Sequence, residues 1–175
     1  MKALVAAVLF AAAPTAAFAG AFDVLSWKPD RLAAVERDSV VDADGMKRAR
    51  ITVIFAQPRT DRAQPYRGLV GLQEFDCAGA RYRTLQSTPF DDSGAMLAAA
   101  TIREPSAWVS ITPGTLGNDE KRRVCDGEWS ARTYTTALPV LMAAYLLRPD
   151  AAEVRTAQAP AASENAAEAS AAAKP

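Results

Sequence analysis

The sequence contains no histidine and only two cysteines, and both shortages restrict the chemistry open to it. Without histidine there is no Ser-His-Asp or Cys-His catalytic pair, no imidazole general base and no His-ligated zinc. Two cysteines are too few for a four-cysteine metal site or an iron–sulfur cluster. We therefore expect a non-enzymatic protein that needs no metal or other cofactor.

Carboxylates offer little more for catalysis. One adjacent pair, Asp91-Asp92, lies between Pro89 and Gly94, a setting typical of a turn. A general acid–base pair needs two carboxylates that face each other across a cleft in different environments. We interpret these two residues as turn formers.

Neither sign of charge is in excess, since 20 basic side chains balance 20 acidic ones and the pI is near 6.3. That balance is far from the basic profile of nucleic-acid-binding proteins, so we expect no nucleic-acid partner. The length of 175 residues suits one domain with extensions at its ends.

The N-terminal residues have the pattern of a signal peptide. Lys2 supplies a positive start, an uncharged apolar run follows, and Ala17-Phe18-Ala19 gives the small-x-small cleavage signal. The run is shorter than the roughly 20 apolar residues of a membrane span. We predict a signal peptide over residues 1–19 and a mature protein that begins at Gly20. Because no cysteine follows the cleavage site, the mature protein is expected to be periplasmic or secreted and not lipid-anchored.

The C-terminal segment changes composition. Residues 150–175 are rich in alanine, lack aromatic residues and contain one branched aliphatic residue, Val154. Such a segment cannot bury enough apolar surface to offset its ordering entropy. We predict a disordered tail there, with a tether to a partner as the alternative. The domain itself is assigned to residues 20–149.

Cys77 and Cys125 lie in the exported part of the chain, where an even number of cysteines predicts a disulfide. Redox-active pairs favour Cys-x-x-Cys spacing, whereas these two are 48 positions apart. A structural disulfide is therefore favoured over a catalytic one.

Strand-like alternation dominates the middle of the chain. Residues 47–55 place Arg48, Arg50 and Thr52 on one face and apolar side chains on the other, and an Asp-Gly turn links them to a partner strand at 37–41. A second hairpin joins 68–76 to 81–86 through a turn in which Gly79 can supply positive φ. Shorter strands are expected at 96–102 and 107–111. Together they predict an antiparallel meander.

Two helices are expected near the C-terminal end. Asn118 is the expected cap of the first, which Gly127 ends, and its order of charges suits the helix dipole. The second, at 137–147 with Thr136 as cap, has no charged residue. It is either buried against the sheet, the preferred interpretation, or covers a partner. The fold class is thus α+β, with a short helix tied to the sheet by one disulfide.

The order of these motifs resembles the surface-adhesin protein E-like family, over roughly 27–127. The resemblance depends on the following groups of residues: Asp38-Ser39-Val40, Gly45, Val53, Gln73-Glu74-Phe75-Asp76-Cys77, Arg81-Tyr82-Arg83-Thr84-Leu85, Gly94, Trp108-Val109, Pro113-Gly114-Thr115 and Arg123-Val124-Cys125. The resemblance implies an antiparallel sheet with a disulfide-linked helix. It also implies adhesins that bind host proteins such as vitronectin and laminin and that form dimers.

Basic residues gather between 47 and 83, and Arg48, Arg50, Arg81 and Arg83 form a candidate binding face on adjacent strands. Such a patch would take an envelope or extracellular protein or an acidic glycan. The alternative is an ordinary solvated sheet face that arises from strand register alone. Trp108 lies in an alternating stretch, and we expect it to pack in the core or at the edge of the domain. The sequence thus predicts an exported binding protein, with a periplasmic housekeeping or assembly factor as the alternative.

Overall fold

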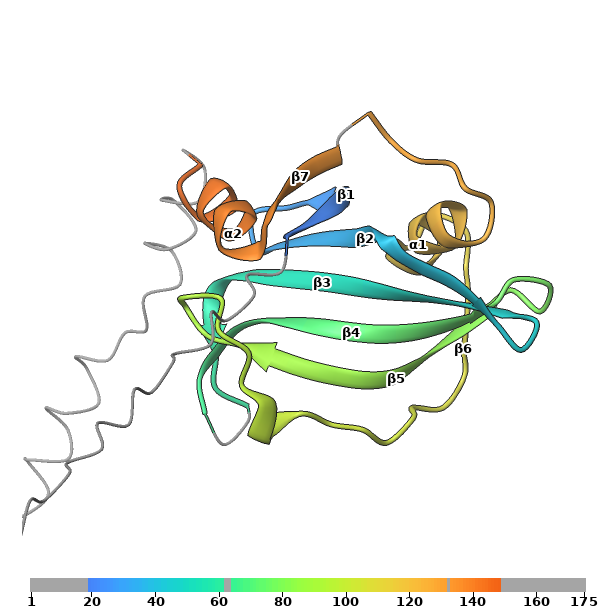
Figure 1. Cartoon of the computed structure of the whole chain (residues 1–175), viewed down its shortest axis with the longest axis horizontal. Coiled ribbons are helices and arrows are strands. Elements are labelled where there is room, and N and C mark those ends of the chain that lie inside the picture. The colour runs from blue at the N-terminus through green and yellow to red at the C-terminus, as the bar shows by residue number, and fades with distance from the viewer. Residues whose placement is uncertain (1–18, 62–63, 132, 149–175) are drawn as a thin grey trace, which may run out of the picture.

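The computed structural model describes residues 19–61, 64–131 and 133–148. They form a seven-stranded antiparallel sheet in the order β6-β5-β4-β3-β2-β1-β7, with helices α1 and α2 and a 3₁₀ turn, η1 (Figure 1). The predicted meander is confirmed. Most of the expected signal peptide and the whole expected tail lie outside the described residues. The elements are β1 (Ala19–Trp27), β2 (Arg31–Ala43), β3 (Met46–Arg59), β4 (Tyr66–Asp76), β5 (Arg81–Phe90), η1 (Ala98–Ala100), β6 (Val109–Ser110), α1 (Leu116–Val124), β7 (Thr133–Ala137) and α2 (Leu138–Leu146).

Both predicted hairpins are present. The first turn has the predicted Asp-Gly pair, whereas the second departs from the prediction. Between β2 and β3, Asp44 and Gly45 both have positive φ, 53° and 76°. Turns of this kind match the twist of the strands they join. Between β4 and β5 the positive φ falls on Ala80, at 47°, and not on Gly79 as expected. Gly79 is required for another reason, because the Asp76 carboxylate lies where its Cβ would be.

The segment between β5 and α1 departs from the prediction. The strand expected at 96–102 is wrong: Met96 and Ile102 each form a single bridge to β5, on either side of η1. The run of alanines in η1 favours a helical turn over a strand. The strand expected at 107–111 shortens to the two residues of β6. Two strands at the opposite edge, β1 and β7, were not predicted, and they pair with each other.

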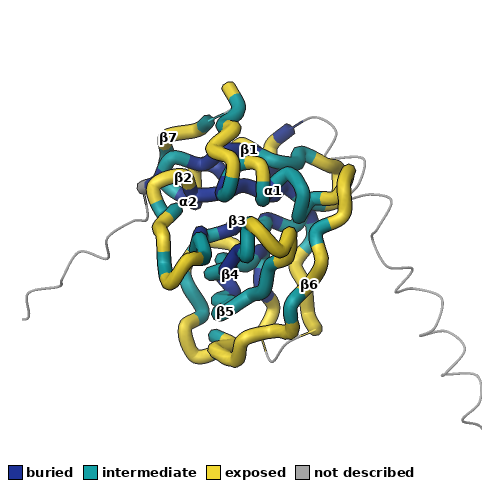
Figure 2. Tube along the Cα trace, turned by 90° about the vertical axis from the view of Figure 1, so that its right-hand side faces the viewer, coloured by how far each residue is buried: buried dark blue, intermediate teal, exposed yellow. Residues whose placement is uncertain are grey.

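The two helices pack against opposite faces of the sheet. Alternate residues of a strand point to opposite faces. On β3, Ile51 belongs to a buried cluster with Val124 of α1, whereas Ile54 belongs to a cluster with Leu141 and Tyr145 of α2. The strand residues of the α2-side cluster come mainly from β1, β2 and β3, and those of the α1-side cluster from β2, β3 and β4. Figure 2 shows buried segments along these central strands.

Helix α1 is held at both ends. Its N-cap is Thr115 and not Asn118, because the Thr115 side chain accepts a hydrogen bond from the Asn118 amide. At its other end, the predicted disulfide between Cys77 and Cys125 is confirmed and joins the helix to the end of β4. Gly127 follows with a φ of 69°, in keeping with its expected role in ending the helix.

Helix α2 presents two unlike faces. One face packs against the sheet, as the preferred interpretation expected, and consists of Leu138, Leu141, Met142 and Tyr145. The other face is exposed and consists of Pro139, Val140, Ala143 and Ala144. Its N-cap is Ala137 instead of Thr136, and no side chain caps it. Among the residues described, no helix has the length and apolar character needed to cross a membrane.

Candidate binding face

The four arginines predicted from the sequence lie on one face of the sheet, the face that α2 covers at its other end. Arg48 and Arg50 project from β3, and Arg81 and Arg83 project from β5. β4 runs between these strands, so the arginines do not lie side by side as the sequence suggested. Each arginine instead forms an ion pair with a carboxylate. We call this set of side chains the arginine ladder; its acidic members are Glu36, Glu74 and Asp76.

Glu74 of β4 holds the centre of the ladder. One carboxylate oxygen accepts hydrogen bonds from Nε and Nη2 of Arg48, at 2.9 and 2.8 Å. The other accepts from Nε and Nη2 of Arg83, at 2.8 and 2.5 Å. Glu74 is only 3% exposed. Burial raises the pKa of this carboxyl, but the hydrogen bonds from the two arginines outweigh burial and hold it below its usual range.

The second pair lies nearer to α2. Arg50 donates from Nε and Nη2 to the two carboxylate oxygens of Glu36, at 2.6 and 2.7 Å. The Glu36 side chain is buried. The hydrogen bond that Arg50 donates to Glu36 raises the pKa of the Arg50 guanidinium above its usual value. Bidentate pairs of this kind fix the positions of both side chains.

The outer end of the ladder is covered by an aromatic ring. Arg81 donates a hydrogen bond to Asp76 at 2.9 Å. The pKa of the Asp76 carboxyl is lowered mainly by a hydrogen bond from the Gly79 amide and, to a smaller extent, by the one from Arg81. The guanidinium carbons of Arg81 and Arg83 lie 4.8 and 4.6 Å from the Trp108 ring centre. Both distances suit cation–π contacts. Trp108 belongs to neither buried cluster of the described residues; it is half-buried and packs over the ladder beside the edge strand β6, not in the core.

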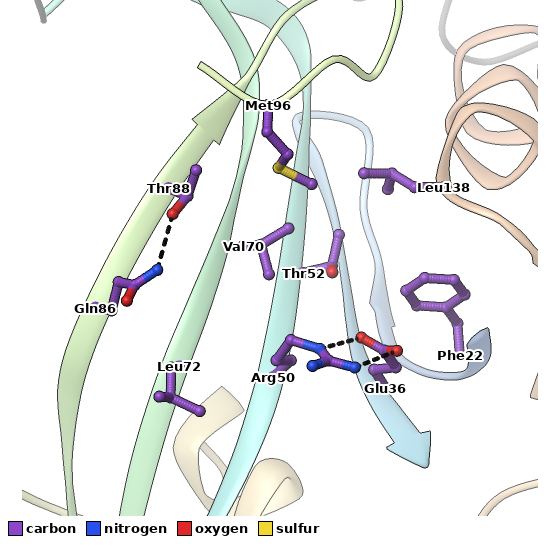
Figure 3. A pocket seen from close by; sticks show the side chains of 10 residues that line it. All are labelled: Phe22, Glu36, Arg50, Thr52, Val70, Leu72, Gln86, Thr88, Met96 and Leu138. Carbon is purple, nitrogen blue, oxygen red and sulfur yellow. Dashed lines mark hydrogen bonds and ion pairs between the residues drawn. The ribbon is translucent and has the colours of Figure 1, made fainter. Parts of the chain in front are cut away.

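A pocket of about 310 Å³ opens between the ladder and α2 (Figure 3). Arg50 and Glu36 form one end, and a Gln86–Thr88 hydrogen bond of 3.2 Å lines the β5 side. Of the residues around the pocket, only Arg50 had been predicted from the sequence. The lining residues are Phe22, Glu36, Arg50, Thr52, Val70, Leu72, Gln86, Thr88, Met96 and Leu138.

The pocket is suited to binding. Its mostly apolar wall can enclose a hydrocarbon or aromatic group, and its few polar side chains can orient a neighbouring polar group. In the described ranges of the chain, no three histidine, cysteine, aspartate or glutamate side chains come together as a metal site would require.

The Asp91-Asp92 segment forms a turn, as the sequence predicts. Asp91 accepts hydrogen bonds from the Ser93 hydroxyl and from the amides of Ser93 and Ala95. The hydrogen bond from the Ser93 side chain is the main cause that lowers the pKa of Asp91. Asp92 pairs with Arg67. These contacts use both carboxylates to hold the loop that carries Met96 to the pocket.

The model of a family described as surface-adhesin protein E matches residues 26–126. The matched span contains both cysteines, all four arginines of the ladder and the whole of α1. No curated protein and no solved structure matches the chain. Because the match covers more than half of the residues, the chain belongs to the surface-adhesin protein E family.

Proposed function

We propose that this protein is an exported binding protein of the cell envelope, and that it binds a protein partner through the pocket and the arginine ladder. Membership of a surface-adhesin family implies export and a binding role outside the cytoplasm. The observation that supports the site is the pocket itself, which opens beside a fixed array of charged side chains on the sheet face.

A protein partner is favoured over an acidic glycan by the state of the arginines. A polyanion binds best to cations that lack a protein partner, whereas all four arginines of the ladder already pair with carboxylates. Displacing Glu74 or Glu36 would leave a buried carboxylate without its cation. A partner protein can instead place an apolar side chain in the pocket and match the alternating charges at its rim.

Filling the pocket tests this proposal. Leu72→Trp places an indole in the pocket, and Leu69→Trp is the matched control, because Leu69 is also half-buried on β4 but points to the opposite face. Binding of the mature domain to immobilised extracellular-matrix proteins, and separately to heparin, is measured by biolayer interferometry. We expect Leu72→Trp to weaken protein binding at least tenfold and Leu69→Trp to leave it within twofold.

Equal binding by both variants would contradict the pocket as the site. Binding to heparin alone, lost on Arg48→Glu and unaffected by Leu72→Trp, would move the proposal to an acidic glycan. Protease treatment of intact cells separates the remaining alternative. Protection until the outer membrane is opened would show a periplasmic protein, and the housekeeping or assembly role would replace adhesion.

A further inference from the structure

The start of β1 lies against Glu36, which lines one end of the pocket together with Arg50. Gly20 is buried, and an ideal Cβ built on it would lie 2.8 Å from Oε1 of Glu36 and 3.0 Å from its Cγ. The Glu36 side chain therefore runs directly over the Gly20 backbone, where any larger residue would displace it. The Gly20 nitrogen, about 2.5 Å from that Cβ position, lies within roughly 5.5 Å of the carboxylate oxygen.

Gly20 is also the residue that the small-x-small signal at Ala17-Phe18-Ala19 would leave at the start of the mature chain. Two unrelated requirements thus meet at one peptide bond. Signal peptidase requires small residues before the cut, and Glu36 requires a residue without a side chain after it.

We propose that the Ala19–Gly20 bond is a processing site, and that the new α-ammonium group of Gly20 forms an ion pair with Glu36. Hydrolysis consumes one water; the carboxylate stays on Ala19 and leaves with the leader, and the nitrogen of Gly20 becomes an ammonium at neutral pH. In the mature protein Glu36 then lies between two cations, the Gly20 ammonium and the Arg50 guanidinium. The pocket end gains one positive charge that the precursor lacks.

The surroundings favour this pair. An opposite charge within about 4–6 Å stabilises the ionised form of a titratable group. Glu36 is 6% exposed, so water screens it little. Arg50 from β3 opposes the ammonium but lies on the other side of the carboxylate, to which it is bonded. Asp38, further along β2, is exposed, and neither β7 nor α2 carries a charged side chain.

The α-amine of the mature protein can be titrated directly. The Cα chemical shift of ¹³C-labelled Gly20 is followed by NMR from pH 6 to 10 in the wild-type mature chain and in Glu36→Gln. An ordinary α-amine titrates at about 7.7–8.0. We expect the wild-type value to lie at least one unit above that of Glu36→Gln. Equal values in the two proteins would overturn the ion pair.

A second variant serves if Glu36→Gln does not fold. A mature chain that retains Ala19 moves the amine one residue away from Glu36 and leaves every side chain of the pocket in place. Its amine is expected to titrate in the ordinary range, and an equally raised value would overturn the proposal.

Mass spectrometry of the exported protein gives the processing site, and any first residue other than Gly20 also overturns the proposal. The inference assumes the export that the proposed function includes. It fails or holds independently of the Leu72→Trp binding result.

Discussion

On one face of the sheet, α1 packs over Val35, Ile51 and Phe75 and is tied to β4 by the disulfide. On the other face, α2 covers only the end of β1, β2 and β3 that carries Leu32 and Ile54, and it is held there by packing and by its direct connection to β7, without a disulfide. Beyond α2 this second face is occupied by the arginine ladder and the pocket.

The difference shows how one sheet can serve as both support and binding surface. The α1 face is closed by close packing: a Cβ on Gly117 would lie 3.1 Å from the Tyr82 ring. The ladder face is ordered by ion pairs, which fix the arginine side chains in place while leaving them partly exposed. Paired charges of this kind are poor evidence of stability but hold defined positions. A stable α1 face therefore leaves the other face free for recognition.

Removal of the disulfide is expected to have the largest effect on the difference in stability between the two faces. The double variant Cys77→Ser/Cys125→Ser is expected to lose about 4 kcal/mol of unfolding free energy, because a loop of this length is no longer constrained in the unfolded chain. Urea denaturation measures the loss. A change below about 1 kcal/mol would show that packing alone holds α1.

The three tryptophans make the same experiment region-specific. Trp129 packs with the α1 cluster, Trp27 contacts Tyr145 of α2, and Trp108 lies over the ladder. With ¹⁹F-labelled tryptophan, the double variant is expected to shift the Trp129 resonance and leave the other two nearly unchanged. Equal shifts of all three resonances would mean that the two faces are not independent.

Truncation in α2 tests the other face. Leu141 is 1% exposed, and Leu141→Ala is expected to cost about 3 kcal/mol through lost burial and the cavity left behind. Val140 is the next residue back on the same helix and is 59% exposed, so Val140→Ala should change stability by less than about 0.5 kcal/mol. Urea denaturation of the two variants gives the comparison. A large cost at Val140 would indicate that a partner or a second copy covers the outer face of α2.

Patterns among residues close in sequence were enough to predict much of the fold. Period-two alternation predicted β3 and separated Arg48 and Arg50 from the apolar face, and the Asp-Gly turn fixed the register of the first hairpin. The cysteine count predicted the disulfide. These features depend on residues close in sequence or on a pairing with only one solution.

Features that depend on distant residues could not be predicted in this way. Asp23 sits in the middle of β1 yet is fully buried, because Ser130 donates to it from N and Oγ at 2.7 and 2.6 Å and Arg123 lies 3.4 Å away. No local pattern marks that strand. The pocket likewise needs α2 and the Met96 loop to meet over β3 and β4.

Cross-strand pairing in the sequence marks the ladder. The hairpin of β4 and β5 places Glu74 opposite Arg83, and Glu74 is also opposite Arg48 on β3. Cross-strand pairing therefore placed a carboxylate between the arginines. Counting basic residues along the chain suggested a positive patch, whereas their pairing in the sheet produces alternating charges.

The last expected effect depends on pH and concerns a carboxyl group under the closed face. Glu120 of α1 is 3% exposed; burial, helped by the charge of Asp119, raises its pKa to about 8. The folded state therefore holds this proton more tightly than the unfolded chain, where a glutamate titrates near 4.5. The contribution to stability is complete below about pH 4.5 and is lost as the pH rises towards 8. At roughly 1.36 kcal/mol per pKa unit, we expect a loss of about 4 kcal/mol between pH 5 and 9.

Glu120→Gln keeps the shape of the side chain and removes the titration. Its unfolding free energy, from urea denaturation, should stay level between pH 5 and 9 and exceed that of the wild type at pH 9. Glu128→Gln is the matched control, since Glu128 follows the same helix and pairs with Arg122 in solvent; its pH dependence should follow the wild type. If Glu120→Gln declined with pH as steeply as the wild type, another group would carry the dependence. The closed face would then owe its stability to packing and the disulfide at every pH.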